Sequence, residues 1–186
     1  MYKRQQYHFL PLAINYDGSS PHRGDGFQFH VGTMRSKSRG FVAIKNADPQ
    51  NSPTIKFNYL SHSDDLKDFR NAIRITRNIL DQPAFKDYAG QEIQPKPTVK
   101  SNRELDEFIK SSVESAFHPC GTCKMGDPAD KETVVTPECK VNGVENLFCA
   151  DSSIFPSITN GNLNAPSIMV GENCLLYTSP SPRDCQ

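Results

Sequence analysis

The sequence has no excess of charge of either sign, because its 21 Lys and Arg residues are matched by 21 Asp and Glu residues. Proteins that bind nucleic acid usually carry a basic surface that neutralises phosphates, so we expect no nucleic-acid partner. Long apolar runs are also lacking: the mean hydropathy is −0.58, and no run approaches the roughly 18 residues of a membrane span. Met1–Gln6 is polar and basic with no apolar run behind it, so we expect no signal peptide. These absences favour a soluble globular fold, or part of one.

No cysteine precedes residue 120, and the six cysteines are Cys120, Cys123, Cys139, Cys149, Cys174 and Cys185. A disulfide-stabilised secreted scaffold distributes its cysteines along a shorter chain, so we expect reduced thiols here. The CxxC formed by the first two is typical of either a redox pair or half of a zinc site. The next two do not lie close together as a zinc ribbon requires, and no thioredoxin-like pattern surrounds the CxxC. We interpret these cysteines as buried thiols and expect no metal site; a non-catalytic zinc-binding module is the alternative.

The chain up to residue 117 shows strand patterns followed by helix patterns. Alternating or β-rich segments predict strands at 26–35, 41–45 and 54–59. Ser63 is the predicted cap of a helix over Asp64–Asp81, and Ser101 with Glu104 forms a predicted capping box that opens a second helix. Strands followed by helices favour an α+β fold with an antiparallel sheet.

Three later segments do not resemble scaffold. In the first, 118–126, a helix would stop before Pro119, so His118 is expected at the end of an element, where it can project into a cleft. The second, 146–156, reads as a short apolar strand that ends in polar residues. In the third, Asn164 is suited to cap a helix with Pro166 in its first turn. The free N–H groups of that helix would favour an anionic ligand or a developing negative charge.

These segments together resemble the C-terminal part of the glucose–methanol–choline flavin oxidoreductases. The resemblance lies in HPCGTCKMG, in VNGVENLFCADSSIFPSITNGNLNAPSIMVGEN, in the run SRGFVAIK to LDQPAF, and in QYHFLPLAINYDG near the start. It implies an antiparallel substrate-domain sheet covered by helices, plus a C-terminal strand and helix that complete a Rossmann-like FAD domain. It also implies FAD as cofactor, and oxidation of an alcohol by loss of a proton to a base and of a hydride to the flavin.

Residue roles follow from the same resemblance. His118 matches the family's active-site histidine, and an imidazole is a reasonable acid or base near neutral pH. Asn162 matches a second catalytic position, where its amide would hold the substrate oxygen as that atom gains negative charge. His8 matches a histidine that helps to bind the alcohol in choline-oxidising members. Ala150, Asp151, Asn162 and Asn164 match positions that contact FAD.

The family binds ADP through a GxGxxG loop, and this sequence contains none. We therefore interpret the chain as a C-terminal fragment that is inactive by itself, with a substrate-binding segment at 6–117 and an active-site and FAD-contacting segment at 118–174. The terminal segments 1–5 and 175–186 do not follow the pattern and resemble translated sequencing-adapter read-through, with native frayed termini as the alternative.

The resemblance is greatest to the choline-oxidising members of the family. It therefore implies choline as the substrate, oxidised to betaine aldehyde towards glycine betaine, and a membrane respiratory electron acceptor as partner. A cytoplasmic or mitochondrial location, peripheral at the inner membrane, is expected with it. Another alcohol dehydrogenase or oxidase of the family and an interaction module remain as alternatives.

Overall fold

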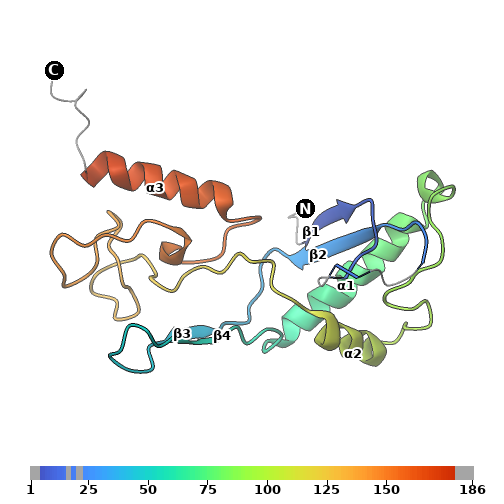
Figure 1. Cartoon of the computed structure of the whole chain (residues 1–186), viewed down its shortest axis with the longest axis horizontal. Helices are drawn as coiled ribbons and strands as arrows, with labels where there is room; N and C mark the ends of the chain where they lie inside the picture. Colours follow the sequence, from blue (N-terminus) through green and yellow to red (C-terminus); the bar gives the residue numbers. More distant parts are fainter. Residues whose placement is uncertain (1–4, 16–17, 20–22, 179–186) are drawn as a thin grey trace, which may run out of the picture. The chain divides into compact units, whose positions relative to one another are not determined.

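A computed structural model describes residues 5–15, 18–19 and 23–178 of the chain (Figure 1). Two compact units divide it: the first comprises Met1–Gly40 and Lys56–Glu114, the second Phe41–Ile55 and Ser115–Gln186. The sequence placed a boundary at 117/118, and the units separate nearby, but 41–55 groups with the second unit. In the described part of the chain, no helix is long and apolar enough to cross a membrane.

The first unit is built on a two-stranded sheet of β1 (Gln5–Leu10) and β2 (Gln28–Thr33). The strands are antiparallel, and their register places Phe9 opposite Phe29. β2 confirms the strand expected within 26–35, whereas β1 was not predicted. The sheet is therefore antiparallel as expected, but it has only two strands.

One face of this sheet packs on aromatic and helical partners. Phe29 contacts Phe85 with ring centroids 6.4 Å apart and an edge-to-face geometry, and Phe27 lies 6.3 Å from the same ring. The Tyr7 hydroxyl donates to the carbonyl of Ala72, which is fully buried in a helix. Edge-to-face aromatic pairs add to the free energy gained by burial alone, so this face anchors the sheet.

The helix beneath the sheet is α1 (Ser63–Leu80), which confirms the helix expected at 64–81. Its N-cap is His62 and not Ser63, because the His62 imidazole accepts the N–H of Asp64. An imidazole nitrogen satisfies the exposed helix donor as a hydroxyl would, so the cap lies one residue earlier. Pro83–Phe85 follows as a short 3-10 turn, η1.

The second helix of this unit is α2 (Asn102–Ser112), opened by the predicted capping box of Ser101 and Glu104. Its buried residues are Leu105 and Ile109. Arg70 of α1 donates twice to the Asp106 carboxylate of α2, at 2.6 and 2.9 Å. Two helices are thereby joined by a partly buried bidentate ion pair.

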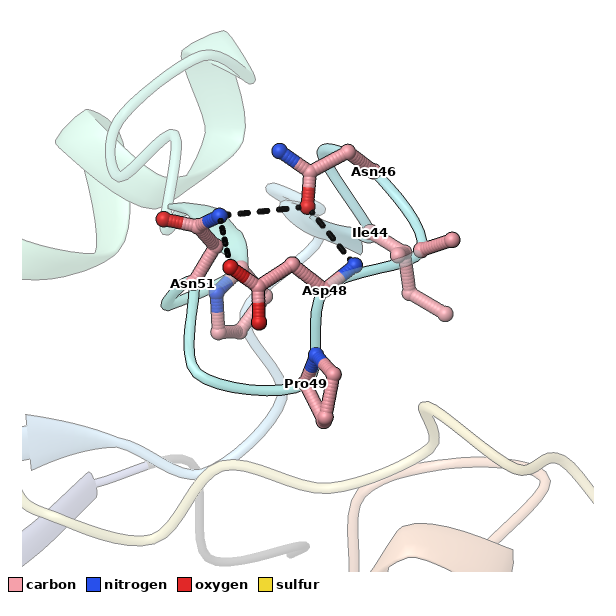
Figure 2. Close-up of a pocket in the computed structure, with 7 residues that line it drawn as sticks. Ile44, Asn46, Asp48, Pro49 and Asn51 are labelled. Atoms are coloured by element: carbon pink, nitrogen blue, oxygen red, sulfur yellow. Dashed lines mark hydrogen bonds between the residues drawn. The ribbon is translucent and has the colours of Figure 1, made fainter.

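A separate hairpin contains β3 (Phe41–Ala43) and β4 (Thr54–Lys56). Both strands are shorter than expected, and their residues are exposed. Side-chain hydrogen bonds within the connecting loop stabilise it. The Asn51 amide donates to the side-chain oxygens of Asn46 and Asp48, and the Asn46 side-chain oxygen also accepts the backbone N–H of Asp48 (Figure 2). These bonds make a shallow pocket at the loop, lined by Ile44 and neighbouring residues.

Apart from β3 and β4, the described part of the second unit holds little regular structure besides η2 (Ser152–Ile154) and α3 (Asn164–Thr178). Isolated bridges join Met125 to Val135, Val135 to Val141 and Lys140 to Phe148. The strand expected within 146–156 is wrong, because this segment has one bridge and then a 3-10 turn. The hydrophobic core of the second unit consists of Val135, Cys139, Ile154, Phe155, Leu163 and Cys174.

The expected break at residue 175 is also not observed. Helix α3 continues to Thr178, so 175–178 extend the helix that was expected to stop before them. Residues 1–4 and 179–186 of the two terminal segments lie outside the described residues. Overall the described chain is a mixed helix and sheet structure with small two-stranded sheets.

Candidate functional site

Two of the three segments singled out in the sequence lie side by side in the second unit. The backbone N–H groups of Gly121, Cys123 and Met125 donate to the carbonyls of η2, at 3.2, 2.8 and 2.8 Å. Gly121 has φ +85° and an added Cβ would meet the Phe155 carbonyl at 3.2 Å, so glycine is required there. This pairing explains why 146–156 forms no strand: its carbonyls are satisfied by a segment far away in sequence.

The third segment joins them through His118. The backbone N–H of Leu163 points at Nδ1 of His118, 3.4 Å away, and Leu163 itself is almost fully buried. His118 is half-buried, and it follows Phe117, which has a positive φ of 58° and an exposed ring. The contact engages Nδ1 of the imidazole, so Nε2 is the ring nitrogen left for a ligand.

Asn162 and Asn164 flank this contact. Both side chains are exposed, and Asn164 is the first residue of α3. The N–H of Ser167 donates to the Leu163 carbonyl at 2.9 Å, so Leu163 occupies the N-cap position of α3. The sequence had predicted Asn164 as the cap, one residue later. The N–H groups of residues 164 and 165 precede the first intrahelical bond, and Pro166 has none. The start of α3 thus lies beside His118, and its first two N–H groups have no acceptor within the helix.

Ala150 and Asp151 come directly before η2, and Asp151 is its N-cap. An added Cβ on Gly171 of α3 would lie 3.7 Å from the Ala150 carbonyl, so the helix passes close to this backbone. The Asp151 carboxylate accepts the N–H of Ser153 at 2.8 Å and caps η2. The hydroxyl and then the backbone N–H of Ser153 lower the pKa of Asp151 below its ordinary value. The carboxylate therefore stays ionised at neutral pH and orders the turn.

Five cysteines of the described residues are free thiols, of which Cys139 and Cys174 are buried. Burial, followed by the neighbouring Cys174 thiol, raises the pKa of Cys139. Burial also raises the pKa of Cys149, although the Ser153 hydroxyl, 3.1 Å from its sulfur, acts in the opposite direction. Within the described residues no group of three or more His, Cys, Asp or Glu side chains is placed to hold a metal ion. The raised pKa values favour packing over nucleophilic roles for these two thiols.

One buried polar atom fits a bound group. Among the described residues, the Thr159 hydroxyl is buried without a hydrogen-bond partner, on the loop that leads to Asn162. A buried hydroxyl without a partner costs free energy, so a ligand that bonded to it would be favoured. Together with the start of α3, it provides hydrogen-bonding groups of the kind that a polar, partly anionic cofactor requires.

His8 belongs to the other unit. It is an exposed residue of β1 and lies opposite His30 in the sheet register. Sequence reasoning did not identify His30, Thr159 or the Leu163 N–H as parts of a site. Only the alternating pattern around His30 marked it as a strand residue, and nothing in the sequence indicated the other two.

Comparisons with known proteins agree on one family. A family model described as GMC oxidoreductase matches residues 36–171. An oxygen-dependent choline dehydrogenase of Brucella ovis is 61% identical over 184 residues, which cover 97% of this chain and 34% of the relative. The pyridoxine 4-oxidase of Mesorbium loti has a TM-score of 0.80 at 30% identity, covering 89% of this chain and 32% of that one.

A formate oxidase of Aspergillus oryzae RIB40, a variant solved to study modification of its FAD, has a TM-score of 0.87 at 26% identity. That match covers 98% of this chain and 32% of the oxidase. The chain therefore spans about a third of the length of the curated relatives it matches.

Proposed function

The chain belongs to the GMC oxidoreductase family, and we propose that it is the C-terminal part of an FAD-dependent dehydrogenase that oxidises choline to betaine aldehyde. The observation that carries the proposal is the contact between Leu163 and His118, which places the imidazole, Asn162 and the start of α3 at one surface. The 61% identity to the Brucella ovis choline dehydrogenase supports choline as the substrate.

FAD, when bound, would supply the hydride acceptor for the alcohol carbon. The backbone at Ala150 and Asp151, the Asn164 side chain and the first N–H groups of α3 would hold it. We further propose that the segment around 146–151 and α3 complete a Rossmann-like FAD domain whose nucleotide-binding loop lies elsewhere in the longer protein. The close passage of Gly171 by the Ala150 carbonyl supports a compact arrangement of these two elements.

His118 and Asn162 would both act on the substrate oxygen, His118 as an acid or base and Asn162 as a hydrogen-bond donor. The Asn162 amide donates to this oxygen as negative charge develops on it, and such a donor in a water-poor site is worth several kcal/mol, about 2.7–4 by analogy with other oxyanion donors. His118 presents Nε2 to the same oxygen. A side chain that takes or holds a proton at this atom typically accelerates a reaction by about 10²–10⁴-fold.

The Leu163 contact decides the form of the imidazole. While Nδ1 accepts the Leu163 N–H, a neutral ring carries its proton on Nε2 and donates to the substrate oxygen. To accept the alcohol proton at Nε2, the ring must carry its proton on Nδ1 and release Leu163. The contact is long at 3.4 Å, but Leu163 is almost fully buried, so an N–H released without another acceptor costs about 1–3 kcal/mol.

The electron acceptor and location are proposed from the same family. We propose that a membrane respiratory carrier takes the electrons and that the longer protein lies in the cytoplasm or mitochondrion, peripheral at the inner membrane. Comparing reoxidation by oxygen and by a soluble quinone would decide the acceptor, and fast reoxidation by oxygen alone would contradict the respiratory carrier.

The first experiment is to extend the reading frame upstream in the source transcript. The proposal requires a GxGxxG strand–turn–helix there, and its absence would overturn the enzyme assignment. The longer protein is then assayed for choline-dependent dye reduction. Turnover with another alcohol and none with choline would replace the substrate and keep the family chemistry.

The catalytic role is tested by His118→Ala in that longer protein. We expect turnover to fall by about 10²–10⁴-fold while FAD remains bound, because the imidazole acts on the substrate oxygen. His62→Asn is the matched control: it replaces another half-exposed histidine, in the other unit, with a residue that also caps a helix. Turnover close to wild type in His118→Ala would contradict the assignment.

A further inference from the structure

The β1–β2 sheet has one face that the helix and aromatic contacts do not use. Side chains alternate between the faces of a strand, and Tyr7 and Phe29 point to the packed face. His8 and His30 therefore lie on the opposite face, and the register makes them a directly opposed cross-strand pair. Directly opposed residues of an antiparallel pair have Cβ atoms about 4.5–5.5 Å apart, so the two imidazoles are neighbours.

Gln28 on the same face fixes the orientation of His30. Its Oε1 accepts the backbone N–H of Ile14 at 3.0 Å, so this side of the amide is the oxygen. Its Nε2 consequently faces Nε2 of His30, at 2.5 Å. An amide nitrogen only donates, so His30 accepts through Nε2 and carries its proton on Nδ1. The backbone at Ile14 thus orients Gln28, and Gln28 orients His30.

We propose that His30 is a positioning residue for substrate binding, which acts by restricting the imidazole of His8. His8 is exposed, and an exposed side chain on a two-stranded sheet loses rotamer freedom when it binds a ligand. A ring held beside it by Gln28 removes part of that freedom in advance, which lowers the cost of binding. The inference rests on the proposed function, because the substrate role of His8 belongs to that proposal.

The test uses the longer flavoprotein and separates binding from turnover. His30→Ala is expected to raise the KM for choline about five- to tenfold and to leave kcat within about twofold, because only ground-state positioning is lost. His30→Phe keeps a ring beside His8 and is expected to raise KM less. FAD content and melting temperature of each variant show that it has folded. Gln5→Ala, on β1 with His8 but on the packed face of the sheet, is the matched control and should keep the wild-type KM.

A double-mutant cycle distinguishes positioning from a merely structural role. If His30 acts through His8, then His30→Ala has no further effect on KM in a His8→Ala background. Additive effects of the two substitutions, or an unchanged KM in His30→Ala, would overturn the inference while choline oxidation by the wild type leaves the proposed function standing. An unchanged KM in His8→Ala would overturn the inference and the substrate role of His8 together. Absence of choline oxidation in the wild type would refute the proposed function itself.

Discussion

Asp65 is a carboxylate that is only 2% exposed, and its replacement should be among the most destabilising changes in the first unit. It lies in the first turn of α1 and accepts four hydrogen bonds from the segment after β2. The N–H of Lys37 donates to Oδ1 at 2.8 Å, and the N–H of Ser38 donates to Oδ2 at 2.9 Å. The hydroxyls of Ser36 and Ser38 donate to Oδ2 at 2.7 and 2.5 Å. Asp65 therefore ties the end of the β1–β2 sheet to α1.

The magnitude follows from the groups left unpaired. In Asp65→Asn the amide oxygen can serve the three donors at Oδ2, but the amide nitrogen then faces the Lys37 N–H, donor against donor. One buried N–H loses its partner and three bonds lose charge assistance, which costs about 2 kcal/mol. Asp65→Ala leaves two backbone N–H groups without this acceptor and should cost about 3 kcal/mol, or about 6–12 °C in Tm where the part that unfolds is a domain of about 150–250 residues.

The assay is thermal unfolding of the longer protein, followed by circular dichroism and FAD release. Asp64→Asn is the matched control, since this neighbouring carboxylate is exposed and pairs with the Lys37 ammonium, and its Tm should stay close to wild type. A Tm of Asp65→Ala within about 2 °C of the wild type would refute the reasoning.

The pH dependence gives an independent check. Burial works to raise the pKa of Asp65, but the hydrogen bonds from Ser38, Lys37 and Ser36 outweigh it, and the pKa is lowered from 3.8. A lowered folded pKa means that the stabilisation is fully present above the unfolded value and is lost as the pH falls through the folded pKa. The Tm difference between wild type and Asp65→Asn should therefore be constant from about pH 5 to 8. A difference that grows or shrinks steadily over that range would contradict the assignment.

Two further predictions concern the second unit. Gly121→Ala should destabilise it by about 1–2 kcal/mol, because alanine is strained at φ +85° and its Cβ presses on the Phe155 carbonyl; the measure is Tm and FAD retention. Gly90→Ala, where nothing lies within 4 Å, is the control, and equal Tm shifts for both variants would refute the argument. Cys139 and Cys149, whose pKa values are raised chiefly by burial, should resist maleimide labelling at pH 7–8 and react only after denaturation, as read by mass spectrometry. Fast labelling of either native thiol would show that it is not buried as described.

Local signals predicted the helices of the first unit well, because each carries its own start signal. Ser101 and Glu104 form the capping box within a few residues of sequence, so α2 needed no tertiary information. The predicted start of α1 was one residue too late, because His62 and not Ser63 is the N-cap. β1 was not predicted because this short segment near Pro11 becomes a strand through its pairing with β2, and no local pattern in the sequence indicates that pairing.

The roles of the candidate site residues stay predictions, and their contacts were not predictable from the sequence. The family motifs located His118 and Asn162, but the bond from Leu163 to His118 joins residues 45 apart in the chain. The same applies to η2, where the apolar run of 146–156 satisfied the usual criteria for a strand. Its carbonyls instead receive N–H groups from Gly121, Cys123 and Met125, and a distant partner of this kind overrides local β propensity.

The balance of buried and exposed apolar surface supports the proposal that this chain works as part of a longer protein. The fully buried large side chains among the described residues are Leu105, Ile154 and Val135. In contrast, the hairpin of β3 and β4 exposes Ile44 at 87% and Ile55 at 58%. A side chain of this size would contribute about 1.5–3 kcal/mol if a partner covered it. The free energy that holds the hairpin in place would then come from contacts made by the rest of the flavoprotein, so the hairpin should order fully only in that context.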